Sequence, residues 1–185
     1  MYFRYKIIGR KNLKLKRPYI IAMNHPYKGD IFALNMMYPL RRFCIMSDES
    51  VFKKWYIRFF LRIYAIYPMS KSTPHKTIED AAKLIKDGNA FAIPSEGTIS
   101  KNGEIGPFRS GTIRIAEAAG GEVPIIPLYI GLRKSRLHRQ KVAIGEPVLL
   151  KDLCPEGADI TNLTSTEAYS ATVMLRELVV ALEKS

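Results

Sequence analysis

Residues 19–30 have the sequence Tyr19-Ile20-Ile21-Ala22-Met23-Asn24-His25-Pro26-Tyr27-Lys28-Gly29-Asp30. The first five residues form an apolar, β-branched run that is typical of a buried strand. The Pro and Gly after it predict a turn at the carboxyl end of this strand, and open α/β sheets bind ligands at that edge. A helix that begins near Lys28 would carry Asp30 in its first turn, facing His25. A histidine oriented by a carboxylate is suited to act as a general base.

Apolar runs and amphipathic segments alternate along the rest of the chain. We expect strands at residues 5–8, 19–23, 42–46, 64–69, 89–93, 123–130 and 141–144. We expect helices at residues 31–38, 50–63, 74–86, 110–119 and 164–183, and loops or connections at 9–18, 100–107 and 150–162. Thr164 and Glu167 predict a capping box at the start of the last helix. The alternation predicts an α/β fold with a central, mostly buried β-sheet flanked by helices, formed by one domain over residues 1–185.

The formal net charge of +12 predicts an anionic partner. The charge alone leaves open a nucleic acid, an anionic membrane face, an acidic carrier protein and a phosphorylated substrate. The absence of helix-turn-helix, zinc-finger and RNA-stacking signatures disfavours nucleic acid. Cys44 and Cys154 lie in unrelated contexts, which favours reduced thiols in a cytoplasmic protein. We expect no metal site, because no Cys/His cluster has ligand spacing, and no spanning helix, because no apolar stretch is long enough.

The helix expected at residues 50–63 has an aromatic face and a basic row. The aromatic face comprises Phe52, Trp55, Tyr56, Phe59 and Ile63, and the basic row comprises Lys54, Arg58 and Arg62. Such a helix is suited to lie in a membrane interface, with its cations against phosphates. It is equally suited to pack on a core with its basic face in solvent, and both interpretations stay open.

A second turn with reactive groups, Ser95-Glu96-Gly97-Thr98, follows the expected strand at residues 89–93. Gly97 would let the backbone approach a substrate and aim N–H groups at developing negative charge. Taken alone, the turn is more typical of a strand exit whose polar groups bond the loop. His75 and Asp80 repeat the His-x4-Asp spacing, but Thr73 and Pro74 before them predict an ordinary, solvated helix start.

Taken together, the two turns resemble a known family. Asn24-His25-x4-Asp30, Glu96-Gly97-Thr98 and Val123-Pro124-Ile125-Ile126-Pro127 follow one another in the order found in the glycerolipid acyltransferases. That family includes the bacterial 1-acylglycerol-3-phosphate acyltransferases. Phe108-Arg109-Ser110-Gly111 is similar to the family's Phe-Lys-x-Gly helix entry, and the resemblance runs from about residue 7 to residue 144.

The resemblance implies a glycerolipid-acyltransferase-like fold and a direct acyl transfer. His25 would remove a proton from the acceptor nucleophile, with Asp30 orienting the imidazole. The acceptor, a lipid or small molecule with a hydroxyl or amine, would attack the thioester of acyl-CoA or acyl carrier protein without an acyl-enzyme and without a cofactor. The implied substrate-binding residues are Asn24, Lys71, Ser95, Glu96, Gly97, Thr98 and Arg109.

The sequence departs from the family pattern at three positions. Ser95 stands immediately before Glu96, where the family turn has a proline. Ile99 stands where the family has the arginine that holds the acceptor phosphate, and Lys71 stands at the arginine position of the family's middle motif. Lys71, Lys101 or Arg109 could replace the missing cation. An acceptor without a phosphate at that point is the simpler interpretation, because isoleucine cannot replace a bidentate cation.

The membrane helices that often precede this domain in the family are absent, which predicts peripheral attachment to the cytoplasmic face of an anionic membrane. Residues 133–141 are rich in cations and suited to CoA phosphates, a carrier protein or lipid headgroups. The competing interpretation is a catalytically silent, basic protein that binds membrane surfaces.

Overall fold

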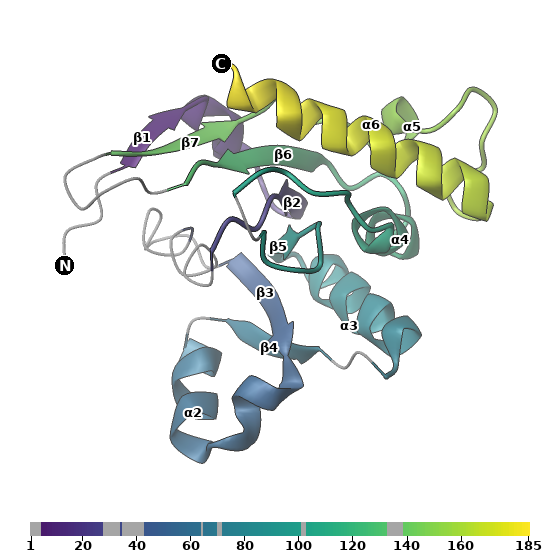
Figure 1. The fold of residues 1–185 in the computed structure, drawn as a ribbon. Coiled ribbons are helices and arrows are strands. Elements are labelled where there is room, and N and C mark those ends of the chain that lie inside the picture. The colour runs from purple at the N-terminus through teal and green to yellow at the C-terminus, as the bar shows by residue number, and fades with distance from the viewer. Residues whose placement is uncertain are drawn as a thin grey trace.

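The computed structural model of the chain describes residues 5–27, 34, 43–63, 65–69, 72–100, 103–132 and 139–185. Its centre is a seven-stranded sheet in the order β1-β7-β6-β2-β5-β3-β4 (Figure 1). The strands are β1 (Tyr5–Ile8), β2 (Tyr19–Met23), β3 (Phe43–Asp48), β4 (Ile66–Met69), β5 (Ala90–Pro94), β6 (Ile125–Ile130) and β7 (Gln140–Ile144). Strands β2 to β6 run in one direction, and β7 pairs antiparallel with β6. The expected α/β fold is confirmed.

The central strands β2 and β6 are buried on both faces, as the continuous apolar run of β2 predicts. Alternate residues of a strand point to opposite faces. Ile20 and Ala22 therefore join a core with α3 (Pro74–Lys86), α4 (Gly111–Ala118), α5 (Leu150–Leu153) and α6 (Ser165–Glu183). Tyr19, Ile21 and Met23 join the opposite core with Leu13, Leu34 and Leu61. Leu61 belongs to α2 (Trp55–Ile63), which lies at the end of the molecule opposite α6 (Figure 1).

Three expected segments differ from the structure. The loop expected at residues 9–18 contains a 3-10 helix, η1 (Arg10–Lys14), because Asn12 Nδ2 donates to the carbonyl of Ile144 at 3.0 Å and Leu13 is buried. The helix expected at 50–63 is split into η2 (Glu49–Lys53) and α2. The connection expected at 150–162 begins with α5, whose two leucines enter the core. Except for Leu34, the helix expected at 31–38 lies outside the described residues.

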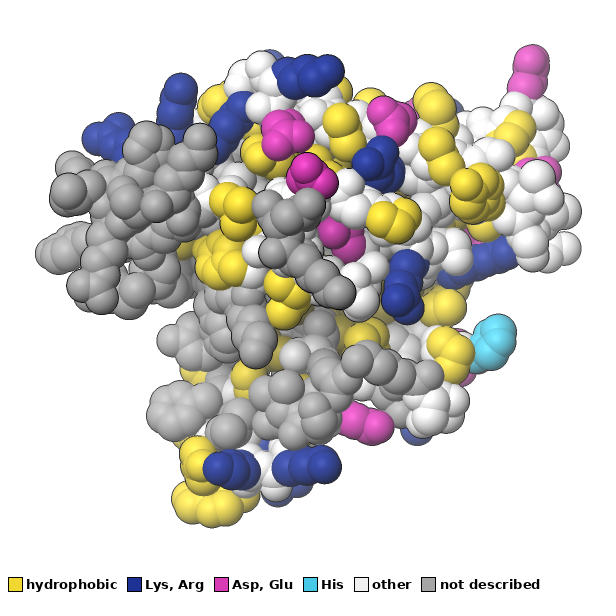
Figure 2. Space-filling model, in the orientation of Figure 1, with side chains coloured by type: hydrophobic (Ala, Val, Ile, Leu, Met, Phe, Trp, Pro, Cys, Tyr) yellow, Lys and Arg dark blue, Asp and Glu magenta, His cyan; other side chains and the backbone are white. Residues whose placement is uncertain are grey.

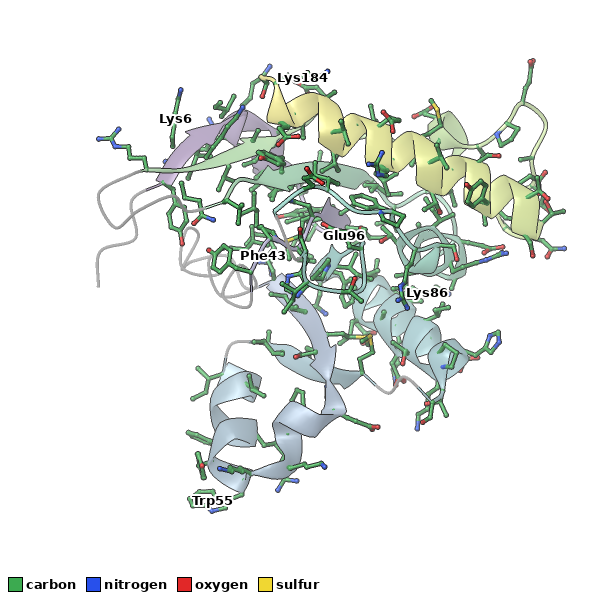
Figure 3. The ribbon with its side chains drawn as sticks, in the orientation of Figure 1. Lys6, Phe43, Trp55, Lys86, Glu96 and Lys184 are labelled. Atoms are coloured by element: carbon green, nitrogen blue, oxygen red, sulfur yellow. The ribbon has the colours of Figure 1, made fainter. Side chains whose placement is uncertain are left out.

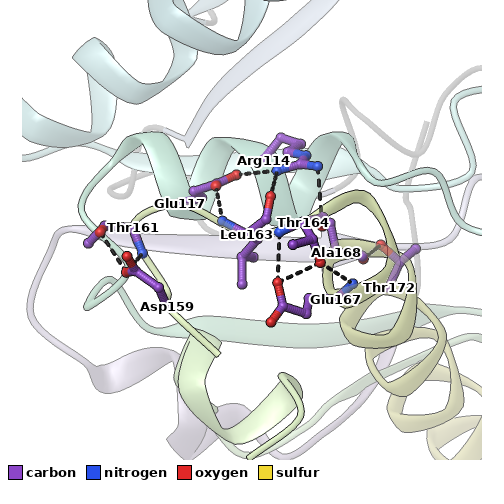
Figure 4. A network of polar contacts seen from close by, with 9 residues as sticks. All are labelled: Arg114, Glu117, Asp159, Thr161, Leu163, Thr164, Glu167, Ala168 and Thr172. Carbon is purple, nitrogen blue, oxygen red and sulfur yellow. Dashed lines mark hydrogen bonds and ion pairs between the residues drawn. The ribbon is translucent and has the colours of Figure 1, made fainter. Parts of the chain in front are cut away.

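The last helix begins where the capping box predicts. The N–H of Glu167 donates to Thr164 Oγ1 at 3.2 Å, and the N–H of Thr164 donates to Glu167 Oε2 at 2.7 Å. Arg114 and Glu117 of α4 bind the main chain of Leu163 just before this cap, at 2.8 and 2.7 Å (Figure 4). These contacts attach α6 to α4 on one face of the sheet.

Candidate active site

Both turns singled out in the sequence lie at the same edge of the sheet. β2 and β5 are parallel neighbours, and their last residues, Met23 and Pro94, are paired. The N–H of Ser95 donates to the carbonyl of Met23 at 2.8 Å, which extends the pairing beyond the strands. His25 and Glu96 therefore come from adjoining turns at the carboxyl end of the sheet, where an α/β fold binds its ligands. Figure 3 shows Glu96 near the centre of the molecule.

Glu96 joins three segments of the chain. Its side chain is only 5% exposed. Oε1 accepts the N–H of His25 at 2.9 Å, and Oε2 accepts the N–H of Gly106 at 3.1 Å. The carbonyl of His25 accepts the N–H of Ser100 at 2.9 Å. The main chain of His25 is thus held on both sides by the turn that follows β5, while its half-buried side chain stays at the sheet edge.

Asn24 connects the end of β2 to the end of β6. Its side chain is 1% exposed, its Nδ2 donates to the carbonyl of Ile130 at 2.9 Å, and its Oδ1 accepts the N–H of Ile130 at 2.7 Å. Both polar atoms of the amide therefore bind the main chain. These two hydrogen bonds fix the position of Asn24, and with it the point at which the chain leaves the sheet before His25.

Arg109 lies across the second turn. Its N–H donates to the carbonyl of Ser95 at 2.8 Å, and a Cβ added to Gly97 would lie 2.8 Å from the Cδ of Arg109. Gly97 has a φ of +67°, and its own N–H donates to the carbonyl of Pro94 at 3.1 Å, so this N–H serves the turn. The Ser95 hydroxyl is buried and lies 2.9 Å from the hydroxyl of Thr112. The turn thus presents the exposed Thr98 and the Arg109 side chain.

A cavity of about 370 Å³ opens beside this turn. Its described lining residues are Glu96, Thr98, Ile99, Ser100, Glu104, Ile105 and Gly106. Ile99, which stands at the expected arginine position, is 37% exposed. Within the described part of this lining the charged side chains are carboxylates.

Several predicted residues lie outside the described residues. These are Asp30, Lys71, Lys101 and residues 133–138 of the basic segment, so their predicted roles stay predictions. His75 and Asp80 are exposed near the start of α3, as expected for a solvated helix start. Sequence reasoning missed Gly106, Thr112 and Ile130, because each contributes through a contact with a residue distant in the sequence.

Neither cysteine offers an activated nucleophile. Burial raises the pKa of the Cys44 thiol above its ordinary value, and burial together with the charges of Glu167 and Glu117 raises the pKa of Cys154. A thiol attacks as the thiolate, which a raised pKa disfavours. No three His, Cys, Asp or Glu side chains within the described ranges are grouped as metal ligands.

The sequence and the fold are similar to those of known proteins. The profile of the Acyltransferase family matches residues 4–131 of the 185, and the chain belongs to this family. It is therefore an acyltransferase of the glycerolipid class. The chain is 25% identical over 185 residues to the 1-acyl-sn-glycerol-3-phosphate acyltransferase of Bacillus subtilis, covering 96% of this chain and 87% of that protein.

Other relatives are longer. The chain is 29% identical over 134 residues to the 1-acyl-sn-glycerol-3-phosphate acyltransferase of Saccharomyces cerevisiae, and the match covers 68% of this chain but only 42% of the yeast protein. The fold is similar to the crystal structure of the 1-acyl-sn-glycerophosphate acyltransferase PlsC from Thermotoga maritima. That comparison has a TM-score of 0.72 at 19% identity and covers 98% of this chain and 72% of the other.

Proposed function

We propose that the protein transfers an acyl chain from acyl-CoA or acyl carrier protein to a hydroxyl of a lysophospholipid-like acceptor. His25 acts as the general base, and Asp30 orients it. One observation carries the proposal: the Glu96 carboxylate accepts the N–H of His25 at 2.9 Å, and this contact between the two turns supports a single site. The names of the relatives, 1-acyl-sn-glycerol-3-phosphate acyltransferases, support this choice of acceptor.

In this reaction the acceptor oxygen attacks the carbonyl carbon of the donor thioester while His25 takes the hydroxyl proton. The C–O bond forms, the C–S bond of the tetrahedral intermediate breaks, and the leaving thiolate takes the proton from the imidazolium. The products are the acyl ester and the free thiol of the donor. The raised pKa values of both cysteines and the bonded hydroxyl of Ser95 support direct transfer without an acyl-enzyme.

The direct test is His25→Ala, with His75→Ala as the matched control because His75 has the same spacing to an aspartate on the exposed start of α3. Loss of a general base lowers turnover about 10²–10⁴-fold. We expect that loss for His25→Ala only, measured as acyl transfer from both donors to a panel of acceptors. Undiminished turnover in His25→Ala would overturn the mechanism.

We propose that Arg109 holds the acceptor phosphate in place of the missing arginine at position 99. The side chain of Arg109 packs on Gly97, which lies in the same turn as position 99, and this contact supports the role. Arg109→Gln should raise the KM for lysophosphatidate about tenfold or more. Lys86→Gln, which removes an exposed cation at the end of α3, should leave the KM unchanged. An unchanged KM in Arg109→Gln would contradict the assignment.

A second candidate is an acceptor without a phosphate. Two carboxylates, Glu96 and Glu104, line the cavity beside Ile99, and they would repel a phosphate there. The two candidates differ in the response to Ile99→Arg. The added cation should improve turnover of lysophosphatidate if a phosphate reaches this position. If the acceptor carries a neutral or amine group there, the added cation should leave turnover unchanged or reduce it.

We also propose that the protein works at the cytoplasmic face of an anionic membrane as a peripheral protein. The net charge of +12 supports attraction to such a surface. None of the helices in the described part of the chain has the length and apolar character that a bilayer crossing requires. The alternative, a silent membrane-surface protein, predicts that vesicle binding is the whole activity, so that no donor and acceptor pair gives turnover above that of His25→Ala.

A further inference from the structure

Helix α2 presents a row of large apolar side chains to solvent. Trp55, Phe59 and Ile63 are four residues apart, so they lie along one side of the helix. Their exposed fractions are 75%, 63% and 46%. Tyr56 beside them is 46% exposed. Figure 3 shows Trp55 at the outer end of α2, away from the sheet. A contiguous exposed apolar patch of this kind marks a binding surface.

The opposite side of α2 fixes this orientation. Leu61 is 6% exposed and belongs to the core on the second face of the sheet, and Phe52 of η2 packs against the same core. Phe52, which the sequence groups with the aromatic face of this segment, therefore packs on the core and does not lie on the exposed side of α2. The helix also packs on β4 and η2. The packing of the helix thus turns the apolar row toward solvent.

Cations border the apolar row. Lys53, Lys54 and Arg58 are exposed, and Lys54 Nζ lies 5.9 Å from the centre of the Tyr56 ring. Figure 2 shows hydrophobic and basic side chains together at the end of the molecule where Figure 1 places α2. Glu49, at the start of η2, is an acidic side chain of the same segment. Aromatic groups beside cations match an anionic lipid surface, where the rings enter the headgroup region and the cations meet phosphates.

We infer that α2 docks the protein on an anionic phospholipid bilayer, with Trp55, Phe59 and Ile63 inserted and Lys54 and Arg58 against phosphates. The segment η2–α2 leaves the sheet at the carboxyl end of β3, and β3 runs parallel to β5. The docking helix therefore follows the same edge of the sheet that carries the candidate site. That docking serves acyl transfer rests on the proposed function. The docking itself can be measured as vesicle binding, in an assay without acyl transfer.

Trp55 is the single tryptophan of the chain, so its fluorescence reports on α2 alone. We expect phosphatidylglycerol-containing vesicles, but not pure phosphatidylcholine, to shift its emission to the blue and to sediment the protein. Lipids with brominated acyl chains should quench it. Phe59→Ser with Ile63→Ser should weaken this binding about tenfold or more, and Lys54→Gln with Arg58→Gln should weaken it to a similar extent.

The matched control is Tyr169→Ser with Val173→Ser, because these residues are exposed at the same spacing on α6. This control should bind vesicles as the wild type does. Sedimentation with unchanged, unquenched Trp55 emission would overturn the inference. So would a blue shift that depends on protein concentration without vesicles, which would assign the face to a second copy of the chain.

Turnover of a short-chain, water-soluble acceptor separates this inference from the proposed function. If α2 serves docking alone, the Phe59→Ser, Ile63→Ser variant turns over this acceptor as the wild type does while its vesicle binding falls. Wild-type protein that binds vesicles through Trp55 but transfers no acyl group would refute the proposed function and support the docking. A variant that loses turnover and binding together, with an unchanged unfolding midpoint, would contradict a docking role confined to α2.

Discussion

Replacing Glu96 by Gln tests whether this carboxylate positions His25. The side chain is 5% exposed, and its two oxygens accept the N–H groups of His25 and Gly106 at 2.9 and 3.1 Å. Gln keeps one acceptor oxygen but turns an NH₂ group toward the other N–H, where two donors then face each other. Loss of a hydrogen bond to a charged acceptor costs about 1.5–3 kcal/mol. We therefore expect the free energy of unfolding to fall by about 2 kcal/mol.

The effect on activity should appear in kcat. A histidine whose main chain is no longer held loses the alignment of its imidazole, and such misplacement costs about tenfold to hundredfold in turnover. Guanidinium unfolding and steady-state kinetics measure both effects. Glu104→Gln is the matched control, because Glu104 lines the same cavity but is exposed. Its free energy of unfolding should stay within about 0.5 kcal/mol of the wild type.

A different result for Glu96→Gln would refute the reasoning. An unfolding midpoint and a kcat like those of the wild type, together with a raised KM for the acceptor, would show that the carboxylate serves the acceptor. Glu96→Ala strengthens the test, because it removes both acceptor oxygens and should cost about 4 kcal/mol. A loss in Glu96→Ala no larger than that in Glu96→Gln would show that only one of the two hydrogen bonds stabilises the fold.

Three further predictions concern the surroundings of the site and the fold. Asn24→Ala should lower the free energy of unfolding in urea by about 2–4 kcal/mol, because it leaves the N–H and carbonyl of the last β6 residue without partners. Gly97→Ala should lower turnover and the unfolding midpoint, because its φ is +67° and the new Cβ would meet the Cδ of Arg109 at 2.8 Å. Burial and the hydrogen bond to Glu183 raise the pKa of Tyr129 from 10.0 to about 12. The neutral phenol is therefore favoured by folding, and its contribution is complete below pH 10.0 and lost as the pH rises through about 12. Thermal unfolding against pH should show the advantage of Tyr129 over Phe shrinking across that interval.

Each of these predictions has a contrary outcome. A wild-type urea midpoint for Asn24→Ala would mean that water replaces the amide at the end of β6. Full turnover in Gly97→Ala would mean that the Arg109 side chain moves aside without loss. A difference between Tyr129 and its Phe variant that stays constant up to alkaline pH would contradict the raised pKa of the phenol.

The chain's local patterns predicted most elements well. β1, β2 and α3 have the expected bounds because each follows a clear apolar run or an amphipathic helix period. η1 and α5 were missed because they are short, and contacts of Asn12, Leu13, Leu150 and Leu153 with distant elements stabilise them. The split between η2 and α2 was missed because one apolar pattern runs through both segments. Which of these apolar residues are buried depends on the packing of Phe52 and Leu61 on the core.

The sequence alone was sufficient for the α/β class, the two polar turns after apolar strands, the family resemblance and the isoleucine at position 99. These features depend on residue type and on short spacings. Only the tertiary structure showed that the Glu96 carboxylate accepts a hydrogen bond from the main chain of His25, 71 residues away in the sequence. It also showed that the second carboxylate oxygen accepts the N–H of Gly106. It also decided which side of α2 faces solvent. The physical reason is that strand neighbours and buried hydrogen bonds are set by long-range packing, which no local pattern specifies.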